Sequence, residues 1–540
     1  MALFGCTVLI IGQPEIATAD NTDKNSVFID SVEINTENVY DLSDPRYDNI
    51  IFRLANKTHI VTRRSVIARE LLIAKGDLYD TALVNEAIRN LRQLPYLLKT
   101  DIALITGQAG ENILVVTSSD KWTTTGGLSI HRSSGRSDLQ IGIEENNLLG
   151  YGMFMSHDFF VLEDDRNYYQ GQISAYRFLG KSAAVSLFYS DSPKHAITSI
   201  ALRRPFYSLR QNLGGGLIYS DNKNRLDYYL SGQIAAQDRI LKSNLIAEGT
   251  YRTGPNRLKY YVTARYEFAD IHGRPRKYTA MPIIIDSHEL STDSISALIP
   301  APPVDTIYHY GQLALRLKQI NYRSFRRINR FSKIEDFNIG FDGHIYAGLA
   351  ISSKSKKRIF SVFGLWPEYT HNYGQTIFIT GFHAKNWFDG TKWLRREYRG
   401  YSYFYMKYNR TMTLAIAVNY IKDELPDNAL SLYLDEDRGL RGYSAFGYGG
   451  NERVVVNIEN RLFSDIELFS VGLGGVIFAD IGNIWSHNKG FRFENIKPSF
   501  GAGFRFGVSR STQAEVIRLD FAYAVENKQW QISVGTGQYF

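Results

Sequence analysis

Two regions with different spacing of apolar residues meet near Lys121. In the first region, a stripe at helical spacing is formed by Leu83, Val84, Ala87, Ile88, Leu91 and Leu94. After Lys121 the helical period disappears, and short alternating or β-branched and aromatic runs recur to the last residue. Clusters of Gly, Asn, Asp and Ser separate these runs. The pattern predicts a small mixed α/β domain followed by a long β region.

Residues 27–118 predict the order strand, helix, helix, strand, strand. Val27–Ile34 alternates as a strand should, and Thr62 is placed to cap a first helix that Gly76 ends. Asp80 is placed to cap the second helix, which carries the apolar stripe. The last two strands are predicted at Leu97–Ile105 and Asn112–Thr117. We expect one sheet with two helices on a face.

The β region alternates most clearly over Thr411–Tyr420, where apolar residues take turns with small or polar ones. A soluble β-sandwich would alternate in the same way. However, about 420 residues of β structure without a second helical layer are hard to bury as one soluble core. The apolar runs are also shorter than the roughly 18–20 residues that a spanning helix needs. We therefore predict a transmembrane antiparallel β-barrel over residues 121–540, with about sixteen strands.

The N-terminal residues have a pattern typical of a secretory signal. Ala2–Gly12 is an apolar run, and Ala17–Ala19 resembles a cleavage site. We predict a signal peptide over residues 1–19, with a buried first strand as the alternative. Its positively charged segment is missing, which leaves the true start codon open. The chain contains one cysteine, Cys6, so an intramolecular disulfide is excluded.

Charge and motif content argue against several functions. The chain has 62 Lys and Arg against 55 Asp and Glu, mixed along the sequence, and no nucleic-acid motif accompanies them. Two basic clusters, Arg323–Lys333 and Lys354–Arg358, are predicted as solvated loop ends, with lipopolysaccharide contact as the alternative. The 11 histidines show no metal-ligand spacing, and G-x-S-x-G is absent. We predict no catalytic residue, metal or cofactor, although a Ser-His-acid set assembled only by the fold stays open.

Several segments, in chain order, carry a resemblance to a known family. The mixed domain, with Arg69–Leu72 and Ile88–Arg92, resembles a POTRA domain. In the β region the matching segments are Asn147–Gly152 (N-L-x-G-x-G), Leu440–Tyr443 (an R-G-Y loop tip), Asn457–Glu459, Phe478–Asn483 and the final Trp530–Phe540. Together these segments resemble the BamA/TamA superfamily of outer-membrane assembly and transport proteins.

The resemblance implies one periplasmic POTRA domain and a sixteen-stranded barrel in the bacterial outer membrane. It also implies that Arg441, Gly442 and Tyr443 form the tip of a loop folded into the barrel, with Glu459 and Asp480 as partners of the arginine. A buried guanidinium needs such partners because an unpaired buried charge is costly. Bidentate arginine–carboxylate geometry would then hold the loop to the wall.

The alternation of the strands treats the two carboxylates differently. Glu459 lies on the polar face of its predicted strand. Strict alternation groups Asp480 with Val476 and Phe478, so we expect a bulge or strand end near Ala479. A solvated loop arginine is the alternative reading of the motif.

The resemblance further implies a C-terminal outer-membrane β-signal. Its residues are Trp530, Ile532, Val534, Tyr539 and Phe540. Gly535 and Gly537 are expected to weaken this last strand, although a glycine in a barrel strand can equally mark a bend. Two features depart from the family: residues 35–60 form a long insertion in the POTRA-like domain, and only one such domain is present.

These features predict an assembly factor that inserts unfolded clients into the outer membrane. Its expected partners are membrane lipid and lipopolysaccharide, unfolded outer-membrane or secreted polypeptides, and periplasmic accessory proteins. A polypeptide secretion pore of the two-partner type is the alternative, although those relatives carry two POTRA domains and a plug helix. An outer-membrane enzyme is the third hypothesis.

Overall fold

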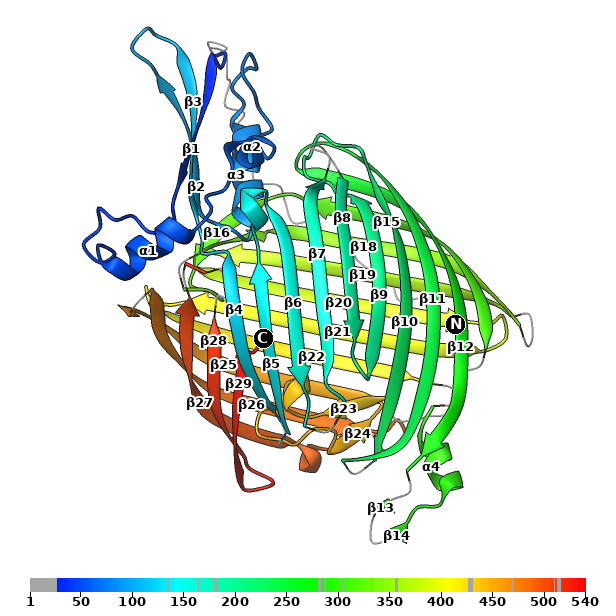
Figure 1. Cartoon of the computed structure of the whole chain (residues 1–540). Helices are drawn as coiled ribbons and strands as arrows, with labels where there is room; N and C mark the ends of the chain where they lie inside the picture. Colours follow the sequence, from blue (N-terminus) through cyan, green and yellow to red (C-terminus); the bar gives the residue numbers. More distant parts are fainter. Residues whose placement is uncertain are drawn as a thin grey trace.

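The computed structural model describes residues 27–540, except 134–135, 164, 179–182, 231, 280–282, 286–287, 301, 303–304, 332, 355–357, 426–430, 469, 509 and 512–515. The predicted signal peptide and Cys6 lie outside these residues. The described chain forms a small α+β unit and one large antiparallel sheet (Figure 1). No helix in the described part of the chain is long and apolar enough to cross a membrane.

The α+β unit contains three strands and three helices. They are β1 (Ser31–Glu37), α1 (Ile50–Thr58), α2 (Arg64–Ala68), α3 (Thr81–Gln93), β2 (Leu97–Thr106) and β3 (Asn112–Asp120). The sheet order is β1-β3-β2, with β1 parallel and β2 antiparallel to β3. As predicted, Asp80 caps α3, and its carboxylate accepts the backbone N–H of Ala82 at 2.8 Å.

Four details of the unit differ from the prediction. The first strand begins at Ser31, not at Val27. Thr62 does not cap the predicted first helix, because its backbone N–H and hydroxyl both donate to the buried carboxylate of Asp120. The helix that follows, α2, has only five residues. The predicted insertion at 35–60 contains a helix of its own, α1.

The large sheet contains twenty strands within the described residues, and each strand pairs with the next wall strand along the chain. The last strand, β29, lies beside the first, β4, so the sheet forms a barrel. The first ten are β4 (Thr124–Ser133), β5 (Arg136–Glu145), β6 (Met153–Val161), β7 (Tyr168–Phe178), β8 (Ala183–Asp191), β9 (His195–Arg204), β10 (Leu213–Leu230), β11 (Gln233–Thr253), β12 (Leu258–Tyr278) and β15 (Thr306–Gln319). The others are β18 (Gly340–Lys354), β19 (Arg358–Tyr373), β20 (Thr376–Phe388), β21 (Trp393–Lys407), β22 (Met412–Glu424), β25 (Glu452–Leu468), β26 (Val471–Trp485), β27 (Lys497–Val508), β28 (Ile517–Ala524) and β29 (Gln529–Thr536).

The prediction of about sixteen strands is therefore wrong. It allotted roughly 26 residues to each strand with its loop, whereas many connections are tight turns. Between β19 and β20 only two residues turn the chain, with Gly374 at φ +57°. Short turns leave more of the chain for additional strands.

Several short elements are not part of the barrel wall. They are β13 (Ile284–Ile285), β14 (His288–Glu289), α4 (Thr292–Leu298), the hairpin of β16 (Tyr322–Arg326) and β17 (Ile334–Asn338), and the pair β23 (Leu432–Leu434) and β24 (Tyr448–Gly450). We call the barrel end beside the α+β unit the proximal end and the opposite end the distal end (Figure 1). The element α4 projects at the distal end, and β16 lies near the proximal end.

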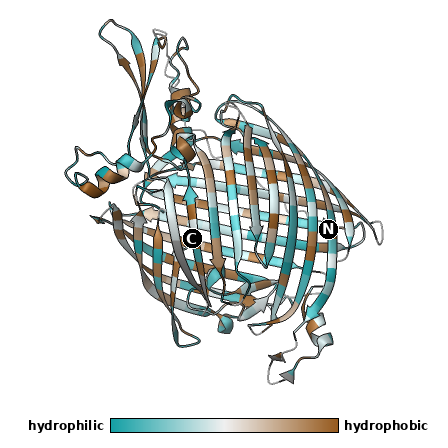
Figure 2. Ribbon diagram, in the orientation of Figure 1, coloured by the Kyte–Doolittle hydropathy of each residue, from teal (hydrophilic) through white to brown (hydrophobic). Residues whose placement is uncertain are grey.

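The two faces of the sheet differ as the alternation predicts. On β22, Thr413, Ala415 and Ala417 are buried on the inner face, while Val418 is exposed. Large apolar side chains such as Leu349 are exposed on the outer face, and Figure 2 shows hydrophobic positions spread over the wall. A protein surface this rich in apolar side chains is typical of a membrane-facing barrel.

Candidate functional site: a polar cluster in the barrel lumen

Three segments from different parts of the chain meet inside the barrel. The first is the distal loop that carries β23 and β24, the second is the β16–β17 hairpin from the proximal end, and the third is the last residues after β29. Arg441 of the loop, Asn329 of the hairpin and Gln538 of the C-terminal segment all bind the same network of side chains. Elements that enter from both ends are thus held together inside the barrel.

The structure brings Arg441 to both of its expected partners. Its Nε and Nη2 donate to the two carboxylate oxygens of Asp480 at 2.7 and 2.8 Å, and its Nη1 donates to Glu459 at 2.7 Å. All three side chains are fully buried. The guanidinium also stacks between the rings of Phe478 and Tyr539, with its carbon 3.5 and 4.0 Å from their centroids.

The expected bulge near Ala479 is wrong. Strand β26 pairs regularly with β25 across this position, and Val476, Phe478 and Asp480 all face the lumen. The apolar pair is tolerated inside because the ring of Phe478 covers the guanidinium of Arg441 and packs in a buried cluster with Val476. The expectation that apolar side chains face outward does not hold where other parts of the chain occupy the lumen.

The residues beside Arg441 hold the loop tip against the wall. Gly442 has φ +88°, and a Cβ there would lie 3.2 Å from the backbone nitrogen of Ala524. Both the backbone conformation and the close approach favour glycine. Tyr443 is fully buried, and its hydroxyl donates to the carbonyl oxygen of Pro498 at 2.9 Å.

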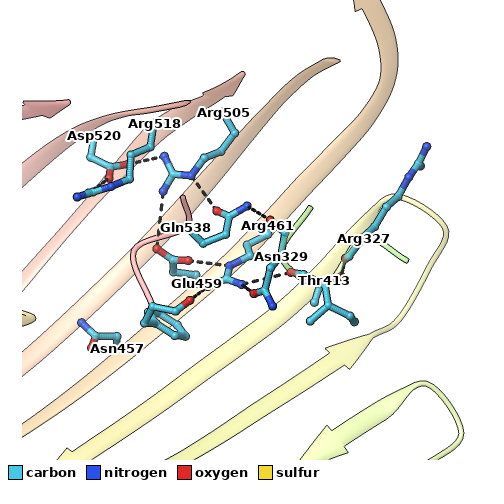
Figure 3. A network of polar contacts seen from close by, with 12 residues as sticks. Arg327, Asn329, Thr413, Asn457, Glu459, Arg461, Arg505, Arg518, Asp520 and Gln538 are labelled. Atoms are coloured by element: carbon cyan, nitrogen blue, oxygen red, sulfur yellow. Dashed lines mark hydrogen bonds and ion pairs between the residues drawn. The ribbon is translucent and has the colours of Figure 1, made fainter. Parts of the chain in front are cut away.

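Three further arginines extend the site (Figure 3). Arg461 donates to Glu459 at 2.7 Å, whereas Arg505 and Arg518 donate to Asp520 at 2.6 and 2.9 Å. We call Arg441, Arg461, Arg505 and Arg518 with Glu459, Asp480 and Asp520 the lumen cluster. Arg461 lies two residues after Glu459, so the alternation of β25 places both side chains on the same face. Nothing in the sequence alone indicates that Arg505 and Asp520, on neighbouring strands, meet.

The hairpin reaches the lumen cluster through its turn. Arg461 donates to the side-chain oxygen of Asn329 at 2.8 Å, and Ile328 is fully buried. Phe325 and Ile328 pack in one cluster with Tyr405 of the wall. The prediction that Arg323–Lys333 is a solvated loop end is therefore wrong for the centre of this segment. Its apolar residues are too few to reveal a buried turn within a basic run.

Glu335 stabilises the hairpin turn from inside. Its Oε1 accepts the backbone N–H groups of Ile328, Asn329 and Arg330 at 3.0, 3.0 and 3.3 Å. Burial raises the pKa of the Glu335 carboxyl above its usual range. The turn is thus organised by one side chain and not by solvent.

The predicted β-signal is divided between the wall and the lumen. Trp530 and Ile532 lie on the exposed outer face of β29, and Val534 shares their alternation. The strand ends at Thr536, so Tyr539 and Phe540 do not continue it. The predicted β-signal therefore includes two residues that lie beyond the last strand.

The chain turns into the lumen at Gly537, which has φ +77°. Tyr539 stacks on Arg441 and donates its hydroxyl to the carbonyl oxygen of Glu436 in the distal loop. The backbone oxygen of Phe540 accepts a hydrogen bond from Arg461 at 2.9 Å. The C-terminal residues therefore join the loop and the hairpin through the lumen cluster.

The Asn147–Gly152 motif forms the joint between the α+β unit and the barrel. The side chain of Asn147 donates to Thr62 at 2.8 Å and accepts the backbone N–H of Gly152 at 2.7 Å. Gly152 has φ +70°, and a Cβ there would lie 2.5 Å from the hydroxyl oxygen of Tyr96. The backbone N–H of Arg63 donates to the carbonyl oxygen of Gly150 at 3.1 Å. These contacts fix the unit to the proximal rim.

The groups of the cluster are suited to holding segments together. Its groups are paired arginines and carboxylates, and no nucleophile–base pair lies among them. Among the described residues no group of three or more His, Cys, Asp or Glu is arranged to hold a metal ion.

Among the comparisons with known proteins, only the one with solved structures finds similar proteins. No family model and no curated protein sequence matches the chain. BamA from Haemophilus ducreyi lacking POTRA domains 1–3 is 12% identical to this chain, with a TM-score of 0.34. The match covers 94% of this chain and 83% of the BamA chain. CdiB from Acinetobacter baumannii (94% and 73%) and CdiB from Escherichia coli (97% and 91%) are each 11% identical with a TM-score of 0.39. The chain is similar to these proteins over most of its length, but the identities and TM-scores are too low to support a conclusion about function.

Proposed function

We propose that this chain is an outer-membrane β-barrel that inserts unfolded polypeptide clients into the membrane at the seam between β29 and β4. The observation that carries the proposal is the shortness of the strands on the β29 side of the seam. Strands β28 and β29 have eight residues each and β4 has ten, whereas β11 and β12 have 21 each. A tilted strand needs roughly 9–11 residues to cross the hydrocarbon of a bilayer.

Short strands at one side of the wall favour insertion there. Lipid must thin beside a wall that is too short, at a modest cost for each ångström of mismatch. Any opening between β29 and β4 would expose backbone N–H and C=O groups to lipid, where they demand a partner. A client strand can supply these partners, which gives insertion a driving force without a fuel.

The α+β unit is proposed to act as a single periplasmic POTRA domain that receives the client. In its sheet order, β1 and β2 are the edge strands. An extended polypeptide can add to such an edge by β-augmentation. The joint at Asn147–Gly152 would hold this edge close to the proximal rim. Periplasmic accessory proteins and lipopolysaccharide are further proposed partners.

A secretion pore is the second candidate, and the size of the barrel favours it. A barrel of twenty strands is wider than one of sixteen, because the diameter grows roughly linearly with strand number. In that case the distal loop and the hairpin would have to leave the lumen to let a chain pass. The two functions therefore differ in whether the loop moves.

Pinning the loop tests this difference. A Cβ built at Gly442 lies 3.4 Å from the Cβ of Ala522, close to the separation found in disulfides. The variant Gly442→Cys/Ala522→Cys, in a Cys6→Ser chain, is reconstituted in liposomes and presented with an unfolded outer-membrane barrel protein. Single-cysteine variants serve as controls for the strain of a side chain at position 442.

We expect the oxidised variant to insert the client at the rate of the unmodified chain, and reductant to change nothing. If oxidation abolishes insertion and reductant restores it, the loop must move and insertion at the seam with a closed lumen is wrong. If the unmodified chain does not accelerate insertion at all, the proposed function fails altogether.

A further inference from the structure

Helix α1 exposes an apolar surface that the lumen cluster and the seam do not use. Ile50, Ile51 and Leu54 are 81%, 62% and 59% exposed. At 100° per residue these three side chains share one side of the helix. Three large aliphatic side chains gathered on one exposed side of a nine-residue helix indicate a surface that something covers.

The opposite side of α1 is firmly attached to the protein. Phe52 is buried and packs against the rings of Tyr40 and Tyr47, at centroid distances of 4.5 and 5.4 Å. The guanidinium carbon of Arg510, from the connection between β27 and β28, lies 4.3 Å from the ring centroid of Tyr47. Arg510 also donates to the carbonyl oxygen of Val39 at 2.6 Å. The helix therefore has a fixed position on the proximal rim.

This position is level with the edge of the apolar wall. The hydroxyl of Tyr47 lies 3.5 Å from the carboxylate of Glu467, near the proximal end of β25. On the same strand end, Ile466 and Leu468 are exposed apolar side chains. Figure 1 shows α1 extending outward past the barrel wall at the proximal end, and Figure 2 shows hydrophobic residues on it. Helix α1 thus lies beside the proximal end of the wall, where apolar side chains are also exposed.

We propose that α1 lies in the interface of the proximal lipid leaflet, with Ile50, Ile51 and Leu54 among the lipid chains. The inference rests on the proposed location of the barrel in a membrane. The basic side chains Arg53, which pairs with Asp48, and Lys57 lie along one border of the apolar side of the helix, as in helices that lie along a bilayer surface. A lipid surface fits better than a protein partner because α1 lies beside the proximal end of the membrane-facing wall, where Ile466 and Leu468 are also exposed.

Helix α1 would then fix the orientation of the α+β unit above the bilayer. The unit is tied to the barrel at Asn147–Gly152, and α1 lies on the rim near the connections of β25–β28. A second attachment through lipid would keep the sheet edges of the unit close to the seam. The long insertion at residues 35–60 would thereby gain a role in membrane contact.

Spin-label accessibility tests the inference on the full chain. In a Cys6→Ser background, a nitroxide is placed by Leu54→Cys, Leu349→Cys or Asn85→Cys, and the protein is reconstituted in nanodiscs of phosphatidylethanolamine and phosphatidylglycerol. Leu349 is 61% exposed on the outer barrel wall, and Asn85 is exposed on α3 of the α+β unit. Accessibility to oxygen reports lipid, and accessibility to a water-soluble nickel chelate reports water.

We expect the label at position 54 to resemble that at 349, with oxygen contact several-fold above nickel contact. Adding Ile51→Glu should return the label at position 54 toward the values found at position 85. If position 54 is as accessible to nickel as position 85 while position 349 is in lipid, α1 does not contact the membrane and its apolar side is left to a protein partner. If position 349 is also in water, the proposed membrane barrel itself fails.

Discussion

Replacing Arg441 by alanine is expected to destabilise the folded barrel by about 3–5 kcal/mol and to release the distal loop. The substitution removes two hydrogen bonds to Asp480 and one to Glu459, all at sites without solvent. Glu459 keeps Arg461 as a partner, whereas Asp480 keeps only the neutral amide of Asn457. The temperature at which the folded form is lost, followed by heat-modifiable gel mobility, measures the effect.

Arg492→Ala is the matched control, because this arginine pairs with Glu494 where both side chains are largely exposed. Such a pair contributes about 0–1 kcal/mol, so its loss should leave the unfolding temperature nearly unchanged. Arg441→Lys should fall between the two, since lysine keeps the charge without the bidentate geometry. Equal stability of the Arg441→Ala and Arg492→Ala proteins would show that the lumen cluster does not hold the loop.

Replacing Tyr539 by alanine is expected to cost about 2–3 kcal/mol. The ring covers the guanidinium of Arg441 on one side, and the hydroxyl donates to the carbonyl oxygen of Glu436. Without the ring, the C-terminal segment loses its contact with the distal loop. Trypsin should then cleave after Arg438 or Arg441 faster than in the unmodified chain, and the same gel assay measures the loss of stability.

Trp530→Ala, on the preceding strand β29, is the control, because its side chain is exposed on the outer wall. The double variant Arg441→Ala/Tyr539→Ala should be less destabilised than the sum of the two single variants, since both remove the same stack. Strict additivity would mean that Tyr539 and Arg441 act independently, contrary to the stacked geometry.

The sequence predicted the wall well because alternation reports which face of a strand is buried. The inward positions of β22 and the polar face of β25 follow directly from it. Helix α3 was likewise predictable from its apolar stripe and its capping aspartate, whereas α1 in the insertion was not predicted. The strand number was not, because turn lengths vary and alternation does not fix them.

The inside of the barrel was predicted only in part. The pairing of Arg441 with Glu459 and Asp480 came from the resemblance to a family and from the cost of an unpaired buried charge. The pairing of Arg505 with Asp520 depends on strand register, which no local pattern encodes. The hairpin and the inward turn after Thr536 depend on the space inside the barrel, which the sequence pattern does not report. Phe478 is therefore buried in the lumen, although apolar residues of a barrel strand are expected to face outward, and Ile328 of the hairpin turn is buried as well.

The central claim is that the chain inserts several different clients into the outer membrane. Depletion of the protein, followed by a quantitative inventory of outer-membrane proteins, tests this claim most directly. We expect several barrel proteins of unrelated function to fall together as the chain is lost. An unchanged set of barrel proteins with the loss of one secreted polypeptide would contradict the claim and assign the chain to secretion.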